Sequence, residues 1–305
     1  MQPYPTIRPR PPAPPRWLTE RMRQVRRGLP RGAEAASARE TAGLLAHLGL
    51  STVCVTARCP NRLECFSQHL ATFLILGEVC TRGCAFCAIK QGRPPLPPDD
   101  REPEAVAEAV AALQLAHVVI TSVSRDDLAD GGAKHFAAVV RALRQNCPAT
   151  TVELLVPDFG GSVASLEQVI AGEPNVVAHN IETVPRLYDR VRRGADYRRS
   201  LDLLRRVKRA GAPVAAKSGI MLGLGEREEE VESVLHELAA TGCDMLTLGQ
   251  YLPPSPRHAP VARYVEPEEF ARWRASALAL GLKSVAAGPL VRSSYLASVF
   301  YQEVA

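Results

Sequence analysis

The sequence of 305 residues is 46% hydrophobic, so the chain can bury a full core without disulfide bonds to staple it. No apolar run approaches the roughly 18 residues that a membrane span needs. No export signal opens the chain, so we expect a cytoplasmic protein without membrane contact. The net charge of +5 is uneven: residues 1–32 hold eight arginines against one acid and carry +7, whereas residues 33–305 sum to −2. This nearly neutral body argues against a nucleic-acid groove within the fold.

The N-terminal arm, residues 1–32, also contains eight prolines, several of them in the run from Pro9 to Pro15. Proline lacks a backbone donor and fixes its own φ, so this density predicts an extended, polyproline-like arm rather than a helix. We expect the arm to dock on the body through the apolar side chains of Trp17 and Leu18.

From residue 70 onward, short apolar runs rich in strand-forming residues alternate with stretches of helical periodicity. Strands are predicted at 71–77, 117–123, 152–156, 176–181, 214–222, 245–251 and, as a short closing run, 284–287. Helices are predicted at 103–113, 133–146, 163–171, 196–210, 227–241 and 267–280. Repeated strand–helix units form a parallel α/β sheet covered by helices, and six of them predict a partial, TIM-like (βα)6 barrel.

The chain is accordingly divided into four parts. These are the arm (1–32), an N-terminal extension (33–69), the partial barrel (70–283) and a C-terminal segment (284–305). Active sites of such barrels lie at the C-terminal ends of the strands. The segments that follow the predicted strands are rich in polar residues: 78–87, 122–127, 180–182, 217–226 and 250–251.

Six of the eight cysteines are crowded between Cys54 and Cys87. Without an export signal, such cysteines are better interpreted as thiolate ligands of metals than as disulfides. One triplet, Cys80, Cys84 and Cys87, has the spacing C-x3-C-x2-C and directly follows the first strand of the barrel. Three thiolates on one loop can hold three irons of a [4Fe–4S] cube and leave the fourth iron open to a ligand. A structural zinc site is the alternative, although the chain offers only one C-x2-C pair.

The other triplet, Cys54, Cys59 and Cys65, has the spacing C-x4-C-x5-C. By its residues alone it is a second metal site that lacks a fourth cysteine. Cys147 and Cys243 lie within or beside apolar helical sequence and are expected in the core.

The loop from Cys80 to Cys87, with the aromatic Phe86 before its last cysteine, resembles the hallmark of the radical S-adenosylmethionine (SAM) superfamily. The resemblance implies that the open iron binds the amino and carboxylate groups of SAM. It also implies that an electron from the cluster cleaves SAM to a 5′-deoxyadenosyl radical. Such a radical removes hydrogen from unactivated carbon, which no side-chain acid or base can do.

Two triplets with these spacings are together similar to the lipoyl synthase family. The similarity continues along most of the chain, in the blocks 121–132, 180–188, 217–226, 249–254 and 292–295. In that family the second serine of the last block, Ser294 here, is the unusual fourth ligand of an auxiliary cluster. The resemblance thus implies two [4Fe–4S] clusters: a SAM-binding one on Cys80, Cys84 and Cys87, and an auxiliary one on Cys54, Cys59, Cys65 and Ser294.

The same resemblance suggests where SAM would lie. Asn180 and Glu182 point to one side of a strand end because they are two residues apart, and they are candidates for contacts with the ribose hydroxyls. Lys217 leaves an apolar strand and needs a partner, either the SAM carboxylate or an acidic neighbour. The remaining candidates for SAM contacts are Phe86, Gly219, Gly223 and Glu226. Glycines at a strand end would let the backbone approach the adenine.

The resemblance implies insertion of two sulfur atoms at C6 and C8 of an octanoyl-lysine, with the auxiliary cluster as the sacrificial sulfur donor. The acylated lysine would belong to a lipoyl carrier domain, such as the glycine-cleavage H protein or a dehydrogenase E2 subunit. Ferredoxin or flavodoxin would supply the electron. The alternatives are another sulfur-inserting radical SAM enzyme, of the biotin synthase or methylthiotransferase kind, and a non-catalytic carrier of electrons between two clusters.

Overall fold

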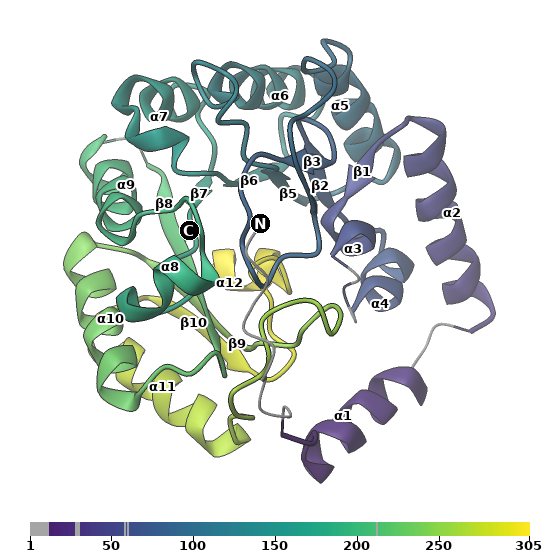
Figure 1. Ribbon diagram of the computed structural model, residues 1–305. Helices are drawn as coiled ribbons and strands as arrows, with labels where there is room; N and C mark the ends of the chain where they lie inside the picture. The colour runs from purple at the N-terminus through teal and green to yellow at the C-terminus, as the bar shows by residue number, and fades with distance from the viewer. Residues whose placement is uncertain (1–11, 28–30, 58, 60, 212) are drawn as a thin grey trace.

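The computed structural model describes residues 12–27, 31–57, 59, 61–211 and 213–305. The predicted polyproline stretch up to residue 11 lies outside these described residues. Within them the fold is organised around one eight-stranded sheet with the strand order β1-β2-β5-β6-β7-β8-β9-β10. In Figure 1 this sheet curves into an incomplete barrel with helices outside it.

Seven strands of this described sheet run parallel, and all seven predicted strand segments are confirmed. Their bounds are Thr72–Ile75 (β2), His117–Ser122 (β5), Thr151–Leu155 (β6), Val176–Ala178 (β7), Ala215–Leu222 (β8), Met245–Gln250 (β9) and Ser284–Gly288 (β10). The short strand β1, Ser51–Thr52, pairs antiparallel with β2 at one edge of the sheet. The strand β10 forms the other edge, so the described sheet is open and does not close into a full barrel.

The six predicted barrel helices are also confirmed, and they form the outer layer in Figure 1. They are Glu102–Ala112 (α5), Ala133–Asn146 (α6), Val163–Ile170 (α7), Tyr197–Arg209 (α9), Glu228–Thr241 (α10) and Pro267–Ala279 (α11). Two apolar clusters fill the space between the sheet and these helices, one including Val106, Phe136 and Leu166 and the other including Leu204 and Phe270. The strand side chains that meet the helices are apolar because helices cover the outer face of the sheet.

The N-terminal extension adds α2 (Ala33–His47), α3 (Val53–Thr56) and α4 (Arg62–Ser67) beside β1. The Thr41 hydroxyl of α2 donates to the carbonyl of Phe66 in α4 at 2.9 Å and is fully buried. The extension is therefore packed as part of the body, and it holds α3 and α4 next to the sheet edge.

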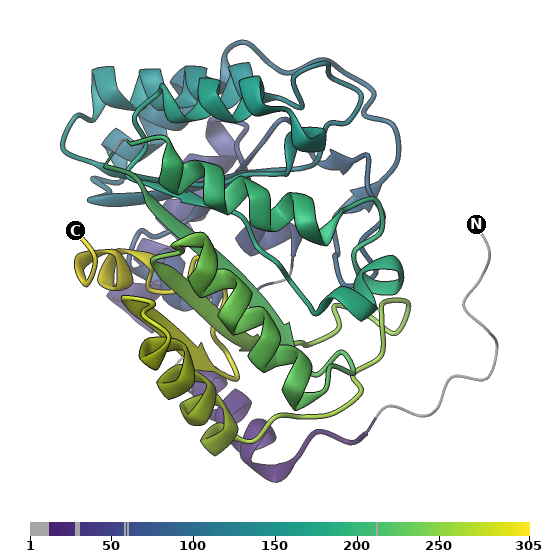
Figure 2. The same cartoon turned by 90° about the vertical axis from the view of Figure 1, so that its left-hand side faces the viewer.

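The C-terminal segment ends in α12, Ala297–Gln302. The ring of Tyr301 lies 6.0 Å from that of His117, the first residue of β5, and Glu303 accepts a hydrogen bond from Ser284, the first residue of β10. The helix therefore closes the end of the barrel at which the strands begin, on the left in Figure 2.

The prediction of an extended arm throughout residues 1–32 is wrong for Arg16–Arg27, which form helix α1. The dense proline run stops at Pro15, whose carbonyl accepts from the amide of Thr19 at 3.1 Å. At that position proline starts a helix without losing a hydrogen bond. Docking through Leu18 is confirmed, because this side chain is only 1% exposed.

The barrel interior contains a buried ion pair between two strands that are separated by β7. The ammonium of Lys217 on β8 donates to the Glu153 carboxylate of β6 at 2.7 Å, and both side chains are almost completely buried. Burial opposes ionisation of Glu153, but the Lys217 charge outweighs it and holds the pKa of this carboxyl below its ordinary value. His117 lies 3.5 Å from the other carboxylate oxygen. This pair fixes the relative position of two strands that flank β7.

We expect Glu153→Ala to lower the free energy of unfolding by about 3–5 kcal/mol, because it leaves the Lys217 charge buried without a partner. Replacing both members, Glu153→Gln with Lys217→Met, is expected to cost much less. Urea unfolding followed by circular dichroism measures both, with Glu104→Ala on the exposed face of α5 as the control. Equal midpoints for Glu153→Ala and the control would contradict the assigned role of the pair.

Candidate active site

The second cysteine triplet lies on a loop above the C-terminal ends of the strands. Its first cysteine belongs to β3, Val79–Cys80, which pairs with β4, Lys90–Gln91. The amide of Gly92 also donates to the carbonyl of Cys80 at 2.9 Å. Residues 80–92, the cysteine loop, are therefore closed at their base, and Cys84 and Cys87 lie within the closed turn.

An arginine inside the triplet anchors the cysteine loop to two strand ends. The Arg82 guanidinium contacts Asp126, after β5, at 2.7 Å and Asp158, after β6, at 2.5 Å. Burial opposes ionisation of Asp158, yet the bond to Arg82 prevails and lowers the pKa of the carboxyl to about 2. The sequence pattern gives no sign of this role, because the strand order alone brings the two carboxylates to Arg82.

Backbone contacts position the rest of the cysteine loop. The amide of Ala85 donates to the Val191 carbonyl at 2.8 Å, and the Ala85 carbonyl accepts from the amide of Ala259 at 2.8 Å. The imidazole of His258 lies 3.1 Å from the Cys87 carbonyl oxygen. Phe86 packs against the apolar cluster under α9 to α11. The loop is thus held on several sides by segments that follow other strands.

The thiols of this triplet share one electrostatic environment. Burial, together with the smaller effect of the nearby Cys80 and Glu182 charges, raises the pKa of Cys84 to about 12 and that of Cys87 to about 11. All three are free thiols. Bound metal would offset the cost of ionising such buried thiols, because metal binding and thiol deprotonation are coupled. Three free thiols of one loop are a donor set that suits an iron–sulfur cluster.

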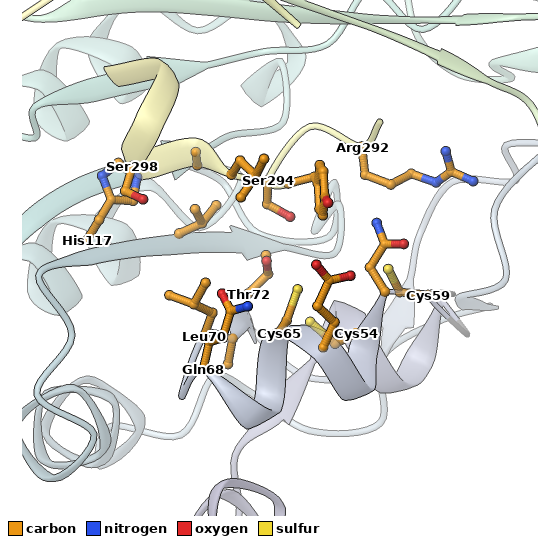
Figure 3. A pocket seen from close by; sticks show the side chains of 17 residues that line it. Cys54, Cys59, Cys65, Gln68, Leu70, Thr72, His117, Arg292, Ser294 and Ser298 are labelled. Atoms are coloured by element: carbon orange, nitrogen blue, oxygen red, sulfur yellow. The ribbon is translucent and has the colours of Figure 1, made fainter. Parts of the chain in front are cut away.

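The first triplet lines a second site, the auxiliary pocket, which is shown in Figure 3. Cys54 comes from α3, Cys65 from α4 and Cys59 from the segment between them, while Ser294 comes from the C-terminal segment. The pocket is also lined by Thr72, His117 and Arg292, among others. The structure therefore brings together the four residues that the sequence comparison with lipoyl synthases places around one cluster.

The chemistry of the auxiliary pocket also suits a cluster. Burial, together with the smaller effect of the neighbouring Cys54 and Cys59, raises the pKa of Cys65 to about 12. In the described part of the chain, no residue is hydrogen-bonded to the Ser294 hydroxyl. The same residues contain no group of three or more His, Cys, Asp and Glu side chains arranged to hold a single metal ion.

Asn180 and Glu182 lie together, as predicted from their spacing. The Asn180 side-chain amide donates to the Glu182 carboxylate at 3.1 Å. Burial raises the pKa of Glu182, and its charge in turn raises the pKa values of Cys84 and Cys87. Glu182 also has a φ of 68°, a left-handed conformation that is rare for a residue with a side chain and is frequent at functional sites.

The other predicted SAM contacts have partners within the protein. The sequence left two partners open for Lys217, the SAM carboxylate or an acidic neighbour. In the structure its partner is the acidic neighbour Glu153. Glu226 accepts from the amides of Gly223 at 2.6 Å and Leu224 at 2.9 Å, and so stabilises the turn after β8. A Cβ at Gly219 would lie 2.8 Å from both Asn180 Oδ1 and Thr247 Oγ1. The absence of a side chain at Gly219 is therefore required by the packing around Asn180.

The radical SAM superfamily model matches residues 74–238, which include the cysteine loop and most of the barrel. Two solved structures share the fold. Methylornithine synthase has a TM-score of 0.52 and 17% identity, with 85% of this chain and 75% of that chain covered. HydG, a maturase of the [FeFe]-hydrogenase, has a TM-score of 0.56 and 12% identity, with 87% and 65% covered. The chain is thus a radical SAM protein with the partial barrel of that class, as predicted.

Curated relatives identify the family within this class. The lipoyl synthase of Trichlorobacter lovleyi is 54% identical over 93% of this chain and 97% of its own length. That of Nitratidesulfovibrio vulgaris strain Hildenborough is 56% identical over 86% of this chain and 87% of its own. That of Geobacter metallireducens is 56% identical over 84% and 90%. The chain belongs to the lipoyl synthase family.

Family membership confirms the prediction of a sulfur-inserting radical SAM enzyme and does not favour the biotin synthase, methylthiotransferase or electron-carrier alternatives. It implies a [4Fe–4S] cluster and SAM as cofactors, and in general terms a lipoyl carrier substrate and a reductant. None of the helices in the described ranges is long and apolar enough to cross a membrane.

We expect Gly219→Ala to weaken SAM binding at least tenfold, because the new methyl group would displace Asn180 and Thr247. Equilibrium dialysis of the protein with labelled SAM measures the affinity. Gly43→Ala is the control, since a Cβ at this α2 position meets no atom within 4 Å. Unchanged affinity in a folded Gly219→Ala protein would show that Asn180 does not depend on the space left by this glycine.

Proposed function

We propose that this enzyme inserts two sulfur atoms, at C6 and C8 of an octanoyl-lysine on a lipoyl carrier domain. In this proposal the auxiliary pocket holds a second [4Fe–4S] cluster. The observation that supports it is the meeting of Cys54, Cys59 and Cys65 with Ser294, from opposite parts of the chain, in one pocket. When bound, the first cluster and SAM supply a radical that takes hydrogen from carbon, and the second cluster supplies sulfur.

We propose Cys80, Cys84 and Cys87 as the ligands of the SAM-binding cluster. Arg82 and the backbone contacts of Ala85 fix the cysteine loop, so the three thiols are oriented before any metal binds. Asn180 and Glu182 are proposed to contact the SAM ribose. Gly219, Gly223 and Glu226 are proposed to lie near the SAM adenine. The Glu226 carboxylate also accepts hydrogen bonds from the backbone amides of its own turn.

In the auxiliary pocket, Ser294 is proposed as the ligand that leaves first. An alkoxide oxygen holds iron less durably than a thiolate, because soft thiolates suit iron–sulfur clusters better. The hydroxyl has no competing hydrogen bond from a described residue, so it is free to face the three thiols. The role of the protein here is to hold a cluster that can be dismantled next to the substrate carbon.

We propose that the acylated lysine of the carrier approaches through a cavity of about 610 Å³ beside the auxiliary pocket. One wall is α1, with Arg21, Gln24 and Val25, and the opposite wall is the segment from Ala287 to Val291. Asn61, Glu64, Gln68 and Tyr295 line both this cavity and the auxiliary pocket. The H protein and E2 subunits are the proposed carriers, ferredoxin or flavodoxin the proposed reductants, and the cytoplasm the proposed location.

We expect Cys59→Ala to separate the two halves of the chemistry. SAM cleavage needs only the other cluster, so 5′-deoxyadenosine should still form, whereas no lipoyl product should appear. The iron content should fall from roughly eight to roughly four per chain, since each [4Fe–4S] cluster holds four irons. Cys84→Ala is the matched variant and should abolish 5′-deoxyadenosine instead. Lipoyl product from Cys59→Ala would refute the second cluster.

The positive arm and α1 are expected to speed the encounter with an acidic carrier. Arg23→Glu, an exposed residue of α1 that does not line the cavity, or removal of residues 1–15, should raise the KM for an octanoylated carrier protein at low salt and leave the KM for a short octanoyl-lysine peptide unchanged. Exposed charges act mainly on encounter, and their effect fades with salt. Arg39→Glu, an exposed arginine of α2, is the control. Equal changes for protein and peptide substrates would argue against docking by this arm.

A further inference from the structure

One hydrogen bond links the end of β7 to the C-terminal segment. The side-chain amide of Asn180 donates to the Ser293 hydroxyl at 2.7 Å, across 113 residues of sequence. The same nitrogen donates to the Glu182 carboxylate at 3.1 Å. The amide oxygen of Asn180 is buried, and no residue of the described ranges is hydrogen-bonded to it. Asn180 therefore uses its nitrogen to join two neighbours and leaves a buried acceptor unsatisfied, which is costly unless a ligand completes it.

Ser293 directly precedes Ser294, the proposed serine ligand, and follows Arg292, which also lines the auxiliary pocket. The backbone just before it is tightly packed over β9, since a Cβ at Gly249 would lie 2.3 Å from the Val291 carbonyl oxygen. The Arg292 guanidinium donates to that carbonyl at 2.7 Å. Because the preceding backbone is fixed, the hydrogen bond of Ser293 influences the orientation of the Ser294 side chain toward the three thiols of the auxiliary pocket.

On its other side, Asn180 donates to Glu182. The segment after Glu182 reaches the cysteine loop, where the Val191 carbonyl accepts from the amide of Ala85 at 2.8 Å. Asn180 is buried and Glu182 is half-buried, and Gly219 leaves no side chain beside the amide oxygen of Asn180. A ligand hydroxyl that donates to this oxygen would fix the amide with its nitrogen directed at Ser293.

We propose that Ser293 is a positioning residue that couples SAM binding at Asn180 and Glu182 to the auxiliary pocket. This inference rests on the proposed function of the two sites. A bound hydroxyl that orients the amide also orients Ser293, and through it the neighbouring Ser294. Coupling between two binding sites is reciprocal. If bound SAM raises the affinity of the auxiliary pocket for its cluster by some factor, the bound cluster must raise the affinity for SAM by the same factor.

The test compares SAM affinity, by equilibrium dialysis, in four anaerobically reconstituted proteins. These are the wild type, Ser293→Ala, Cys59→Ala and the double variant. In the wild-type background, loss of the auxiliary cluster through Cys59→Ala should weaken SAM binding roughly threefold to tenfold, the size of one hydrogen bond. In the Ser293→Ala background the same change should have no effect. The same weakening in both backgrounds would overturn the coupling.

Ser293→Thr, which keeps the hydroxyl, should restore the dependence of SAM affinity on the auxiliary cluster. Ser276→Ala, an exposed serine of α11 away from both pockets, should leave that dependence as in the wild type. The wild type alone gives a second measurement: SAM should change the spectroscopic signal of the reduced auxiliary cluster, and an unchanged signal overturns the inference. Roughly four irons per wild-type chain would instead refute the proposed function. Roughly eight irons, with a SAM affinity that does not depend on the auxiliary cluster, would refute only the positioning role of Ser293.

Discussion

The main sheet has seven parallel strands in the described part of the chain, one fewer than the eight that close a TIM barrel. The incomplete closure is the constraint on which the rest of the structure depends, because the side between β2 and β10 must be covered. The N-terminal extension covers one edge through β1, α3 and α4, and the segment after β10 turns back to end in α12. The opening is thus filled from both ends of the chain, and the residues that fill it create the auxiliary pocket.

The two cysteine triplets differ in how they are held. The cysteine loop is anchored by charges and backbone contacts to the ends of other strands, so its shape depends on the barrel. The first triplet lies on two short helices and a connecting segment, opposite Ser294. A second site made of separate pieces is consistent with our proposal of an auxiliary cluster that is consumed as the sulfur donor. Burial makes free thiolates costly at both sites, and metal binding offsets that cost.

Much of this could be predicted from the sequence, and the failures have physical reasons. Strands and barrel helices were correctly predicted because apolar runs and helical periodicity report directly on burial. Helix α1 was not predicted, because the whole arm was expected to be extended on account of its prolines. The dense proline run ends at Pro15, and the helix begins directly after it. The link from Asn180 to Ser293 and the anchoring of Arg82 depend on residues far apart in sequence. Neither leaves a local pattern, so only the folded chain reveals them.

The central claim is that sulfur comes from a cluster held by the auxiliary pocket. Reconstituting the enzyme with isotopically heavy sulfide, removing the free sulfide and adding octanoyl-lysine peptide, SAM and reductant tests it in a single turnover. The mass of the product should show that both inserted sulfur atoms are heavy, with at most about one product per chain, because one [4Fe–4S] cluster supplies both. Sulfur atoms of natural mass in the product, or many products per chain without cluster repair, would contradict the account.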